Sequence, residues 1–378
     1  MTLPDTPAPT RGARQRYLAL VRGEARGPWA ATQRLALLAA SVPYGAAVRL
    51  RNLFYRRGWW RSHRAGVSVV SVGNLTVGGT GKTPCVEYVA RFYRERDVRV
   101  AVLSRGYGAE SGPNDEALVL EENLPDVPHL QGADRVQWAR AAVEELESEV
   151  LVLDDGFQHR RLARDLDLVL LDATDPWGQG YLLPRGLLRE PPSSLRRASA
   201  VLLTRCDQVP PTDRSRLRDR VARLAPGVPV VETRHQPLGL VNSDGATALL
   251  DELRRRPVAA FCGIGNPAAF ERTLRDLGAE VCAFRAYPDH HAYSRADVDD
   301  LTAWARGLGG DGQLVATQKD LVKLRVARLG DWPLWALRVG LEPGAGKDIL
   351  DRLLLSALAA PTAGTGSEAR RIRPEDRA

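Results

Sequence analysis

The sequence predicts an α/β protein of two domains joined by a hinge: a larger one around a parallel sheet and a smaller α/β domain. Three observations support this. Short apolar runs alternate with helical patterns in two successive series, which indicates parallel strands covered by helices on both faces. A stretch with Pro, Gly and three consecutive arginines separates the series. A basic segment with an amphipathic helical pattern precedes both.

These patterns divide the chain into six segments. We expect a basic, poorly ordered N-terminus (1–28), an amphipathic membrane-associated helical region (29–62), the larger α/β domain (63–236), a hinge or linker (237–256), the smaller C-terminal α/β domain (257–360) and a disordered tail (361–378).

Apolar runs and helical periodicity place the elements of the two domains. In the larger domain we expect strands at 67–72, 98–104, 127–130, 150–153, 166–171, 200–203 and 230–233, with helices at 83–96 and 134–146. In the smaller domain we expect strands at 258–261, 280–284, 313–316 and 334–339, with helices up to 277, at 296–307 and at 348–358.

Composition restricts the class of protein. Of 378 residues, 44% are hydrophobic and 26% charged, as in a soluble globular protein long enough for two cores. The four cysteines (Cys85, Cys206, Cys262 and Cys282) lie far apart and form no Cys-x-x-Cys. This spacing argues against a zinc site and a disulfide framework, and for a reducing compartment.

Positive charge is concentrated at the N-terminus. Residues 1–66 contain twelve arginines, no lysine, and only Asp5 and Glu24 as acids, so they carry +10 while the rest of the chain carries −3 of the overall +7. A basic arm of this kind suits an anionic surface as a partner, either a membrane or a nucleic acid.

The arm includes an apolar helical pattern that begins near Trp29 and that we expect Pro43 and Gly45 to interrupt. The uncharged stretch 35–48 is 14 residues long, too short to span a bilayer. An apolar face with arginine flanks and the pair Trp59-Trp60 suits a helix lying in a membrane interface. A helix packed on the core with a solvated arginine face fits the pattern equally well.

Residues 67–83 predict a phosphate-binding loop. A buried strand runs into a glycine-rich turn, and Lys82 and Thr83 open a helix. Glycines let backbone N–H groups face an anion, and the helix N-terminus adds its dipole. We expect Lys82 to reach the β- and γ-phosphates and Thr83 to bind Mg²⁺. The expected nucleotide-binding residues are Thr76, Val77, Gly78, Gly79, Thr80, Gly81, Lys82 and Thr83; Thr76 stands where this motif has its leading glycine.

Several polar residues follow predicted strands. Asp154 and Asp155 end an apolar strand, and with the loop upstream a Mg²⁺ role is favoured over a turn cap. Asp115 could act as a base on a hydroxyl, although its spacing alone favours a helix N-cap. His290 could pair with a carboxylate across a cleft, or be a polar loop residue. Arg185 and Arg189 lie on the long loop 173–197. They could bind a transferring phosphoryl group through their positive charge, or they could be loop residues exposed to solvent.

Together these segments resemble one family, the tetraacyldisaccharide 4'-kinases (lipid A 4'-kinases) of Gram-negative bacteria. The motifs that carry the resemblance are VGNLTVGGTGKTP (72–84), LSRGYG (103–108), DDGFQH (154–159), LP (183–184), LREP (188–191), GIGNP (263–267), PDHH (288–291) and TQKD (317–320). They occur in the family's order over roughly residues 30–345, and Thr76 looks like the family's own variant of the loop.

The resemblance implies a P-loop kinase that uses ATP and Mg²⁺ to phosphorylate the 4'-hydroxyl of an acylated glucosamine disaccharide 1-phosphate, forming lipid IVA. It implies a peripheral or monotopic place on the cytoplasmic face of the inner membrane and no nucleic-acid partner. By position, the residues that look catalytic are Asp115, its partner His290 in the opposite domain, Lys82 and Arg189. Those that look metal-binding are Thr83, Asp154, Asp155 and Glu116.

The chain departs from the family's pattern in places. The usual Gly-Asp-Glu-Pro around the catalytic carboxylate is Asn114-Asp115-Glu116-Ala117 here, and Arg185 stands where the family has Ala. The alternative hypothesis is a nucleic-acid-dependent or regulatory P-loop NTPase. It draws on the basic arm and on Thr204-Arg205-Cys206-Asp207, which faintly resembles a guanine-reading motif. It also requires a nucleic-acid module, and no such module is recognisable in the sequence.

Overall fold

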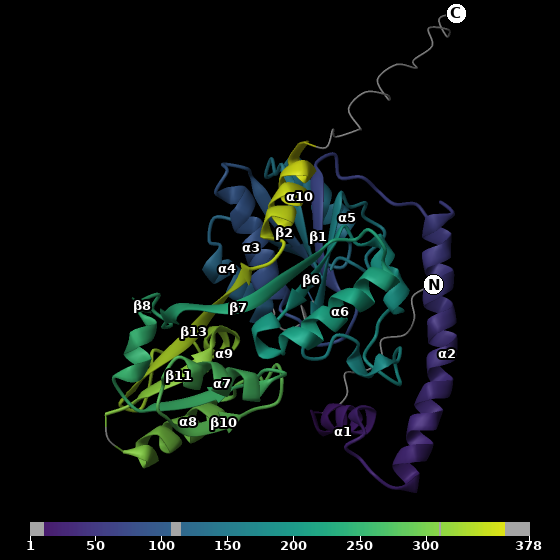
Figure 1. The fold of residues 1–378 in the computed structure, drawn as a ribbon. Coiled ribbons are helices and arrows are strands. Elements are labelled where there is room, and N and C mark those ends of the chain that lie inside the picture. The colour runs from purple at the N-terminus through teal and green to yellow at the C-terminus, as the bar shows by residue number, and fades with distance from the viewer. Residues whose placement is uncertain (1–10, 107–114, 310, 360–378) are drawn as a thin grey trace, which may run out of the picture.

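The computed structural model describes residues 11–106, 115–309 and 311–359, and it confirms a mixed α/β fold on one large, mainly parallel sheet (Figure 1). The strands are β1 (Ser68–Asn74), β2 (Val100–Ser104), β3 (His129–Gln131), β4 (Val150–Asp154), β5 (Leu166–Asp172), β6 (Ala200–Thr204), β7 (Val230–Val241), β8 (Thr247–Ala248), β9 (Val258–Cys262), β10 (Val281–Ala286), β11 (Gln313–Thr317), β12 (Arg328–Leu329) and β13 (Trp332–Pro343). They follow the order β10-β9-β11-β13-β7-β6-β5-β1-β4-β2-β3, with β8 beside β7 and β12 beside β13.

The helices cover this sheet and extend it at the N-terminus. They are α1 (Arg11–Arg22), α2 (Pro28–Arg56), α3 (Lys82–Arg94), α4 (Asp115–Asn123), α5 (Arg135–Glu144), α6 (Pro211–Leu224), α7 (Pro267–Asp276), α8 (Arg295–Leu308), α9 (Gln318–Leu324) and α10 (Lys347–Ala359). Short 3-10 turns occur at Gly178–Gly180, Pro192–Arg197, Cys206–Gln208 and Leu250–Arg254.

In the larger unit, the parallel strands from β6 to β3 are buried by helices on both faces. Val70 and Val72 of β1 pack with α3, α4 and α10 on one face. Val69 of β1 packs with α5, and Val169 of β5 with α6, on the other. Because both faces are covered, these strands are continuous apolar runs, which is why the sequence predicted them so directly.

In the smaller unit, β9, β10 and β11 are parallel, and helices again lie on both faces of the sheet. The core on one face joins Phe261 and Leu314 to α8 and α9, while the other joins Val258 and Val315 to α7. Helix α9 follows β11 directly and was not predicted; only its TQKD motif was noticed in the sequence.

The predicted linker is wrong over its first residues, because β7 continues to Val241. Val230–Glu232 pair in parallel with β6, and Thr233–Val241 pair antiparallel with β13. Pro237 and Gly239, which suggested a linker, lie at a bulge that leaves Leu238 unpaired. Two long strands therefore run between the units, as Figure 1 shows.

The C-terminal helix is also placed differently from the prediction. Helix α10 was expected to complete the smaller domain, yet its Leu350 and Leu354 lie in the core beside Val70 and Val72 of β1. Tyr93 of α3 donates a hydrogen bond to the Leu354 carbonyl at 2.8 Å. The chain thus returns to the larger unit, and the predicted tail at 361–378 lies outside the described residues.

Two predictions for the N-terminal arm are corrected. Residues 11–22 form helix α1, although 1–28 was expected to be poorly ordered; residues 1–10 lie outside the described part. Helix α2 runs unbroken through Pro43 and Gly45. Pro43 is tolerated because the carbonyl that it leaves without a donor belongs to the exposed Ala39 and can meet solvent. Among the described helices, none has the length and apolar character needed to cross a bilayer.

Candidate functional site

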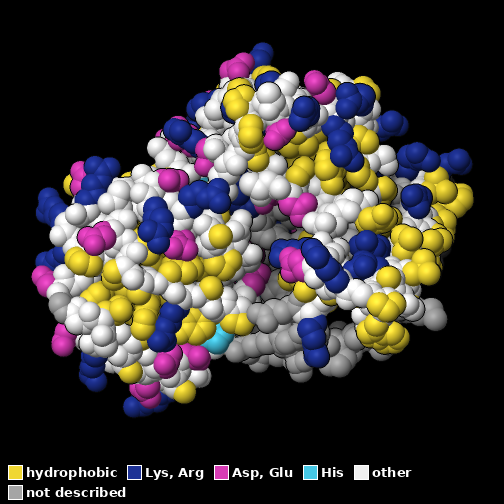
Figure 2. Space-filling view, turned by 60° about the horizontal axis from the view of Figure 1, so that its bottom comes forward, with side chains coloured by type: hydrophobic (Ala, Val, Ile, Leu, Met, Phe, Trp, Pro, Cys, Tyr) yellow, Lys and Arg dark blue, Asp and Glu magenta, His cyan; other side chains and the backbone are white. Residues whose placement is uncertain are grey.

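A large cavity of about 2110 Å³ lies between the two units. Its walls come from the glycine-rich loop (76–83), the start of α4, the loop after β10 and helix α9. Figure 2 shows the surface hollowed between two lobes, with acidic and basic side chains on the walls. The carboxyl ends of β1 and β4 open into it, which is where doubly wound sheets bind ligands.

The glycine-rich loop is held in a fixed conformation by its neighbours. Asn74 donates a side-chain hydrogen bond to the Thr80 hydroxyl at 2.8 Å, and Thr204 donates to the Thr80 carbonyl at 2.9 Å. Gly81 caps α3 with φ +85°, and a Cβ there would lie 2.5 Å from His235 Nε2. Only glycine fits this position, so the sequence places the free N–H groups of α3 at the cavity.

Lys82 opens α3 and takes part in a charged network. Its Nζ lies 3.6 Å from Asp155 Oδ1, and Arg189 Nη1 donates to both oxygens of the same carboxylate, at 2.8 and 2.7 Å. Burial would raise the pKa of Asp155, but the Lys82 and Arg189 charges outweigh it and lower that pKa. The structure thus brings together the predicted residues Lys82, Asp155 and Arg189, and the Asp155 carboxylate is paired with both cationic side chains.

Asp154 differs from its neighbour. Its side chain is buried, and its Oδ1 has no hydrogen-bond partner in the described part of the chain. Burial, with Glu116 and Asp155 nearby, raises the pKa of Asp154 to about 6. A buried carboxylate oxygen of this kind, on a cavity that the buried Thr83 also lines, fits a hard divalent cation such as Mg²⁺.

The other expected metal ligands are engaged differently. Within the described residues, no group of three or more His, Cys, Asp and Glu could hold a metal ion. Glu116 and Asp155 are both paired with cations. Mg²⁺ in phosphoryl-transfer sites commonly takes only one or two protein ligands, with phosphate and water completing its shell. Among the expected ligands, Thr83 and Asp154 are therefore the two residues that fit a Mg²⁺ site.

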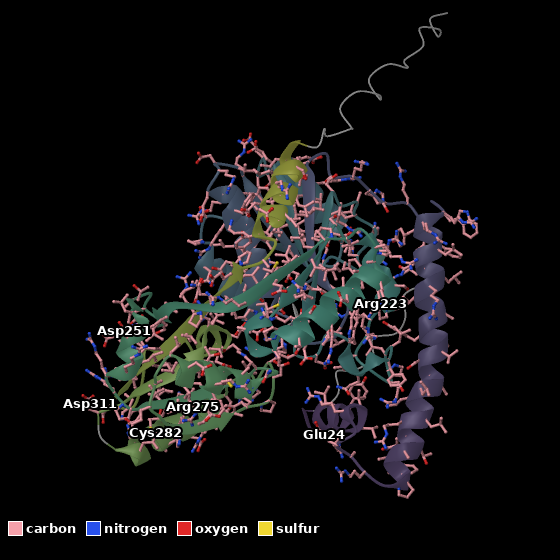
Figure 3. The ribbon with its side chains drawn as sticks, viewed as in Figure 1. Glu24, Arg223, Asp251, Arg275, Cys282 and Asp311 are labelled. Atoms are coloured by element: carbon pink, nitrogen blue, oxygen red, sulfur yellow. The ribbon has the colours of Figure 1, made fainter. Side chains whose placement is uncertain are left out.

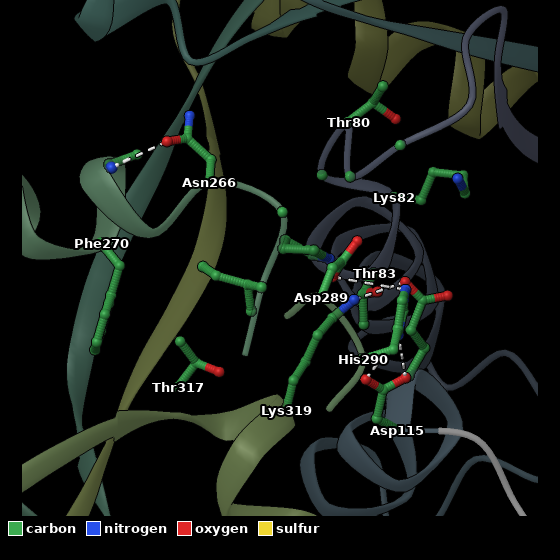
Figure 4. A pocket seen from close by; sticks show the side chains of 18 of the residues that line it. Thr80, Lys82, Thr83, Asp115, Asn266, Phe270, Asp289, His290, Thr317 and Lys319 are labelled. Atoms are coloured by element: carbon green, nitrogen blue, oxygen red, sulfur yellow. Dashed lines mark hydrogen bonds and ion pairs between the residues drawn. The ribbon is translucent and has the colours of Figure 1, made fainter. Parts of the chain in front are cut away.

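Asp115 and His290 meet across the cavity, although 175 residues separate them in the chain. His290 Nδ1 lies 3.0 Å from Asp115 Oδ2 and 3.2 Å from Oδ1 (Figure 4). The hydrogen bond to Asp115 raises the pKa of His290. Burial would raise the pKa of Asp115, but His290, Lys319 and Lys323 together hold it well below its usual range.

Helix α9 supplies two lysines that the sequence analysis did not assign. Lys319 Nζ lies 2.6 Å from Glu116 Oε1, and Lys323 Nζ lies 3.4 Å from Asp115 Oδ2. Burial would lower the pKa of Lys319, yet the carboxylates of Glu116 and Asp115 raise it. The spacing of four residues puts both lysines on one face of a helix, a signal that could have found them.

The buried carboxylate of Asp320 organises the second unit's side of the cavity. It accepts hydrogen bonds from the Gly263 N–H and the Tyr293 hydroxyl, both at 3.0 Å, and from the Thr317 hydroxyl at 2.6 Å. The Gly263 carbonyl in turn accepts from the His290 N–H at 3.0 Å. His290 has a φ of +57°, so this network holds a backbone conformation that non-glycine residues seldom adopt.

Comparisons with known proteins are consistent with this geometry. A family model described as tetraacyldisaccharide-1-P 4'-kinase matches residues 33–359. The tetraacyldisaccharide 4'-kinase of Anaeromyxobacter dehalogenans (strain 2CP-C) is 46% identical over 356 residues, which cover 88% of this chain and 92% of that protein. The tetraacyldisaccharide 4'-kinase of Syntrophus aciditrophicus is 41% identical over 324 residues, which cover 79% of this chain and 85% of that protein.

A solved structure is similar as well. The crystal structure of LpxK from Aquifex aeolicus in complex with ATP has a TM-score of 0.69 and 32% identity, and the match covers 86% of this chain and 99% of that one. Because the family model spans most of the chain and relatives over 40% identical match along most of their length, the chain belongs to the tetraacyldisaccharide 4'-kinase family.

Proposed function

We propose that this protein transfers the γ-phosphate of ATP to the 4'-hydroxyl of an acylated glucosamine disaccharide 1-phosphate, forming lipid IVA. One observation carries the proposal. The Asp115–His290 pair and the Lys82 end of the glycine-rich loop line the same cavity. A phosphate cradle facing a proton acceptor is what in-line transfer to a hydroxyl requires.

The loop residues 76–83 and Lys82 bind the nucleotide phosphates in this proposal, with the N-terminal dipole of α3 behind them. Arg189 leaves Asp155 for a phosphoryl oxygen, because a guanidinium suits the charge that spreads there. Thr83 and Asp154 would hold Mg²⁺, which would supply charge neutralisation for the transferring phosphate when bound. Asp155 and Glu116 support that side of the cavity.

The Asp115–His290 pair removes the proton of the acceptor hydroxyl. Because the two groups are hydrogen bonded, they titrate as one unit, and the proton belongs to the pair rather than to either residue. The lowered pKa of Asp115 makes it a weak base by itself. The raised pKa of His290 makes the pair a stronger base near neutral pH than Asp115 alone.

The surface of α2 supports a membrane-bound acceptor. Its small or short side chains face the protein, among them Ser41, Gly45 and Val48, while Trp29, Leu35 and Val42 are exposed by 73%, 66% and 68%. Trp59 and Trp60 follow the helix and are also exposed. Figure 2 shows hydrophobic side chains gathered on the flank where α2 lies. We place this face in the cytoplasmic leaflet of the inner membrane.

The two units open and close about β7 and β13, which connect them. The contacts across the cavity are polar: Asp115–His290, Glu116–Lys319 and the amide pair Asn123–Gln318, where Gln318 donates at 3.1 Å. A polar interface of this kind separates readily, so ATP and acceptor can enter before closure brings Asp115 to His290.

A transfer assay tests the function. The purified protein should move ³²P from γ-labelled ATP to the disaccharide 1-phosphate in detergent micelles, and ³¹P NMR should locate the new phosphate on the 4'-oxygen. Lys82→Ala should abolish transfer. Nucleic-acid-stimulated ATP hydrolysis with no labelled glycolipid would instead favour a nucleic-acid-dependent NTPase and would contradict the proposal.

A further inference from the structure

Helix α1 lies outside residues 33–359, the part of the chain that matches the family model. It lies beside the cavity, between the second unit and α2 (Figure 1), and Figure 3 labels Glu24 just beyond its end. Three of its side chains, Tyr17, Leu18 and Arg22, line the same cavity as Lys82, Asp115 and His290. A segment outside the family match therefore forms part of the wall of the proposed active site.

The loop 182–187 fixes α1 in this place. The Tyr17 hydroxyl donates to the Pro184 carbonyl at 2.9 Å, and Arg185 Nη1 donates to the Val21 carbonyl at 3.3 Å. The Arg185 guanidinium also lies 4.5 Å from the ring centre of Tyr181. Arg185, the residue that departs from the family's pattern, thus holds the helix that the family match does not include.

The same loop reaches the phosphate side of the cavity. The Leu187 carbonyl accepts a hydrogen bond from the Val77 N–H at 2.8 Å, within the glycine-rich loop. Its backbone also continues into Arg189, whose side chain holds Asp155. Because α1 is attached to this loop, its position relative to the glycine-rich loop is fixed.

The cavity-facing side of α1 has amphiphilic chemistry. Arg22 is exposed, with no hydrogen bond or ion pair to any residue in the described ranges. Leu18 is half-buried, and Leu183 and Leu187 line the cavity with it. A guanidinium and three leucines on the walls of the same cavity suit a phosphate monoester that is joined to acyl chains. ATP has no acyl chain, and its phosphates have their own binding groups at Lys82 and α3.

We propose that α1 is an acceptor-binding wall, in which Arg22 binds the 1-phosphate of the acylated disaccharide and Leu18 contacts its acyl chains. The proposal rests on the function proposed above. The location of α1 agrees with it, because α1 lies between α2 and the second unit (Figure 1) and lines the cavity that Asp115 also lines.

Kinetics in neutral detergent micelles test this role. Arg22→Glu should raise the KM for the disaccharide 1-phosphate about tenfold or more, as expected for loss of a charge-assisted hydrogen bond, while KM for ATP stays unchanged. Arg22→Lys should recover part of the loss. Arg26→Glu, an equal charge change at an exposed residue that does not line the cavity, should have little effect.

A second acceptor separates phosphate binding from a structural effect. With the disaccharide that lacks the 1-phosphate, wild type and Arg22→Glu should have the same KM. Equal loss with both acceptors, or a change in KM for ATP instead, would overturn the role of Arg22 while leaving the kinase activity standing. If the wild-type protein transferred no phosphate to either acceptor, the proposed function and this inference would both fall.

Discussion

The carboxylate of Asp115 contacts two side chains from the other unit, the His290 imidazole and the Lys323 ammonium. Asp115 raises the pKa of His290, and His290 helps to lower the pKa of Asp115, so this contact between the units depends on pH. His290, with its raised pKa, contributes stability that is complete below its unfolded value of about 6.5 and is lost as pH rises through the folded value. Asp115, with its lowered pKa, contributes above about pH 3.9 and loses its contribution as pH falls through the folded value.

The first prediction follows from these signs. The stability difference between wild type and His290→Ala should be largest between about pH 4 and 6.5 and should shrink at higher pH. Thermal unfolding over a pH series measures it. Cys282→Ser, at an exposed position of the same unit, is the control and should show no such window. A difference that grew toward pH 9 would mean that the contact does not depend on a protonated His290.

The second prediction concerns Asp154. Because its pKa is raised to about 6, the buried carboxyl costs stability that develops as pH rises from its unfolded value of about 3.9 and is complete above about 6. Without ligands at pH 8, Asp154→Asn should therefore raise the melting temperature by a few degrees. It should also reduce the further shift produced by Mg²⁺ with a nonhydrolysable ATP analogue.

The matched control for that substitution is Asp213→Asn on the exposed face of α6, which should change neither quantity. An unchanged Mg²⁺-dependent shift in Asp154→Asn would remove Asp154 from the metal site and leave the buried carboxylate oxygen without a role.

At this scale, the sequence predicted the residue types better than their partners. Lys82 and Asp155 follow recognisable strands, and both line the cavity. The Asp115–His290 contact joins residues 175 apart, and spacing alone favoured a cap for Asp115. Only resemblance to a family paired them. Lys319 and Lys323 received no role because a short helix after β11 was not expected.

At the scale of elements, α9 is the part of the second unit that meets α4. Lys319→Met should lower turnover about tenfold or more, because Glu116 then lies in the cavity without its cation and α9 loses a contact across the interface. Steady-state kinetics at saturating substrates measure the effect. Lys347→Met, which removes a pair with Asp351 on α10, is the control. Equal turnover in both variants would show that α9 does not help to assemble the site.

Helix α2 carries the membrane prediction. The double substitution Leu35→Glu and Val42→Glu should lower binding to anionic vesicles at least tenfold, because each exposed side chain contributes roughly 1.5 kcal/mol or more when buried in lipid. Vesicle co-sedimentation measures it. Leu249→Glu, at a residue 77% exposed in the second unit, should bind as wild type does. Unchanged binding by the α2 variant would move the membrane contact elsewhere.

Two elements were misread for the same physical reason. Pro43 in α2 and Pro237 in β7 both suggested an interruption, because proline removes a backbone donor. Each lies where that loss is harmless: Pro43 opposite an exposed carbonyl and Pro237 beside a bulge. In α1, the apolar residues Tyr17, Leu18 and Val21 were a helical signal that the surrounding Pro, Gly and Arg obscured.

At the scale of the whole molecule, β7 and β13 bring the two units into one sheet, while α10 returns to the first core. The sequence predicted both cores because buried parallel strands are continuous apolar runs. It could not predict that the strands between them were paired, because β7 forms its antiparallel ladder with residues about a hundred positions later. Nor could it assign α10, since the apolar face of a helix does not specify which core it covers.

The proposed active site depends on this arrangement, because each unit supplies only part of the residues that line the cavity. Lys82, Asp154 and Asp115 belong to the first unit, and His290 and Lys319 to the second.

The central claim is that closure makes Asp115 and His290 one proton acceptor for phosphate transfer. A double-mutant cycle on kcat for transfer from ATP tests this most directly. Each of Asp115→Asn and His290→Ala should lower kcat about 10²- to 10⁴-fold, and the double variant should be little worse than either. Independent losses that multiply in the double variant would contradict the claim.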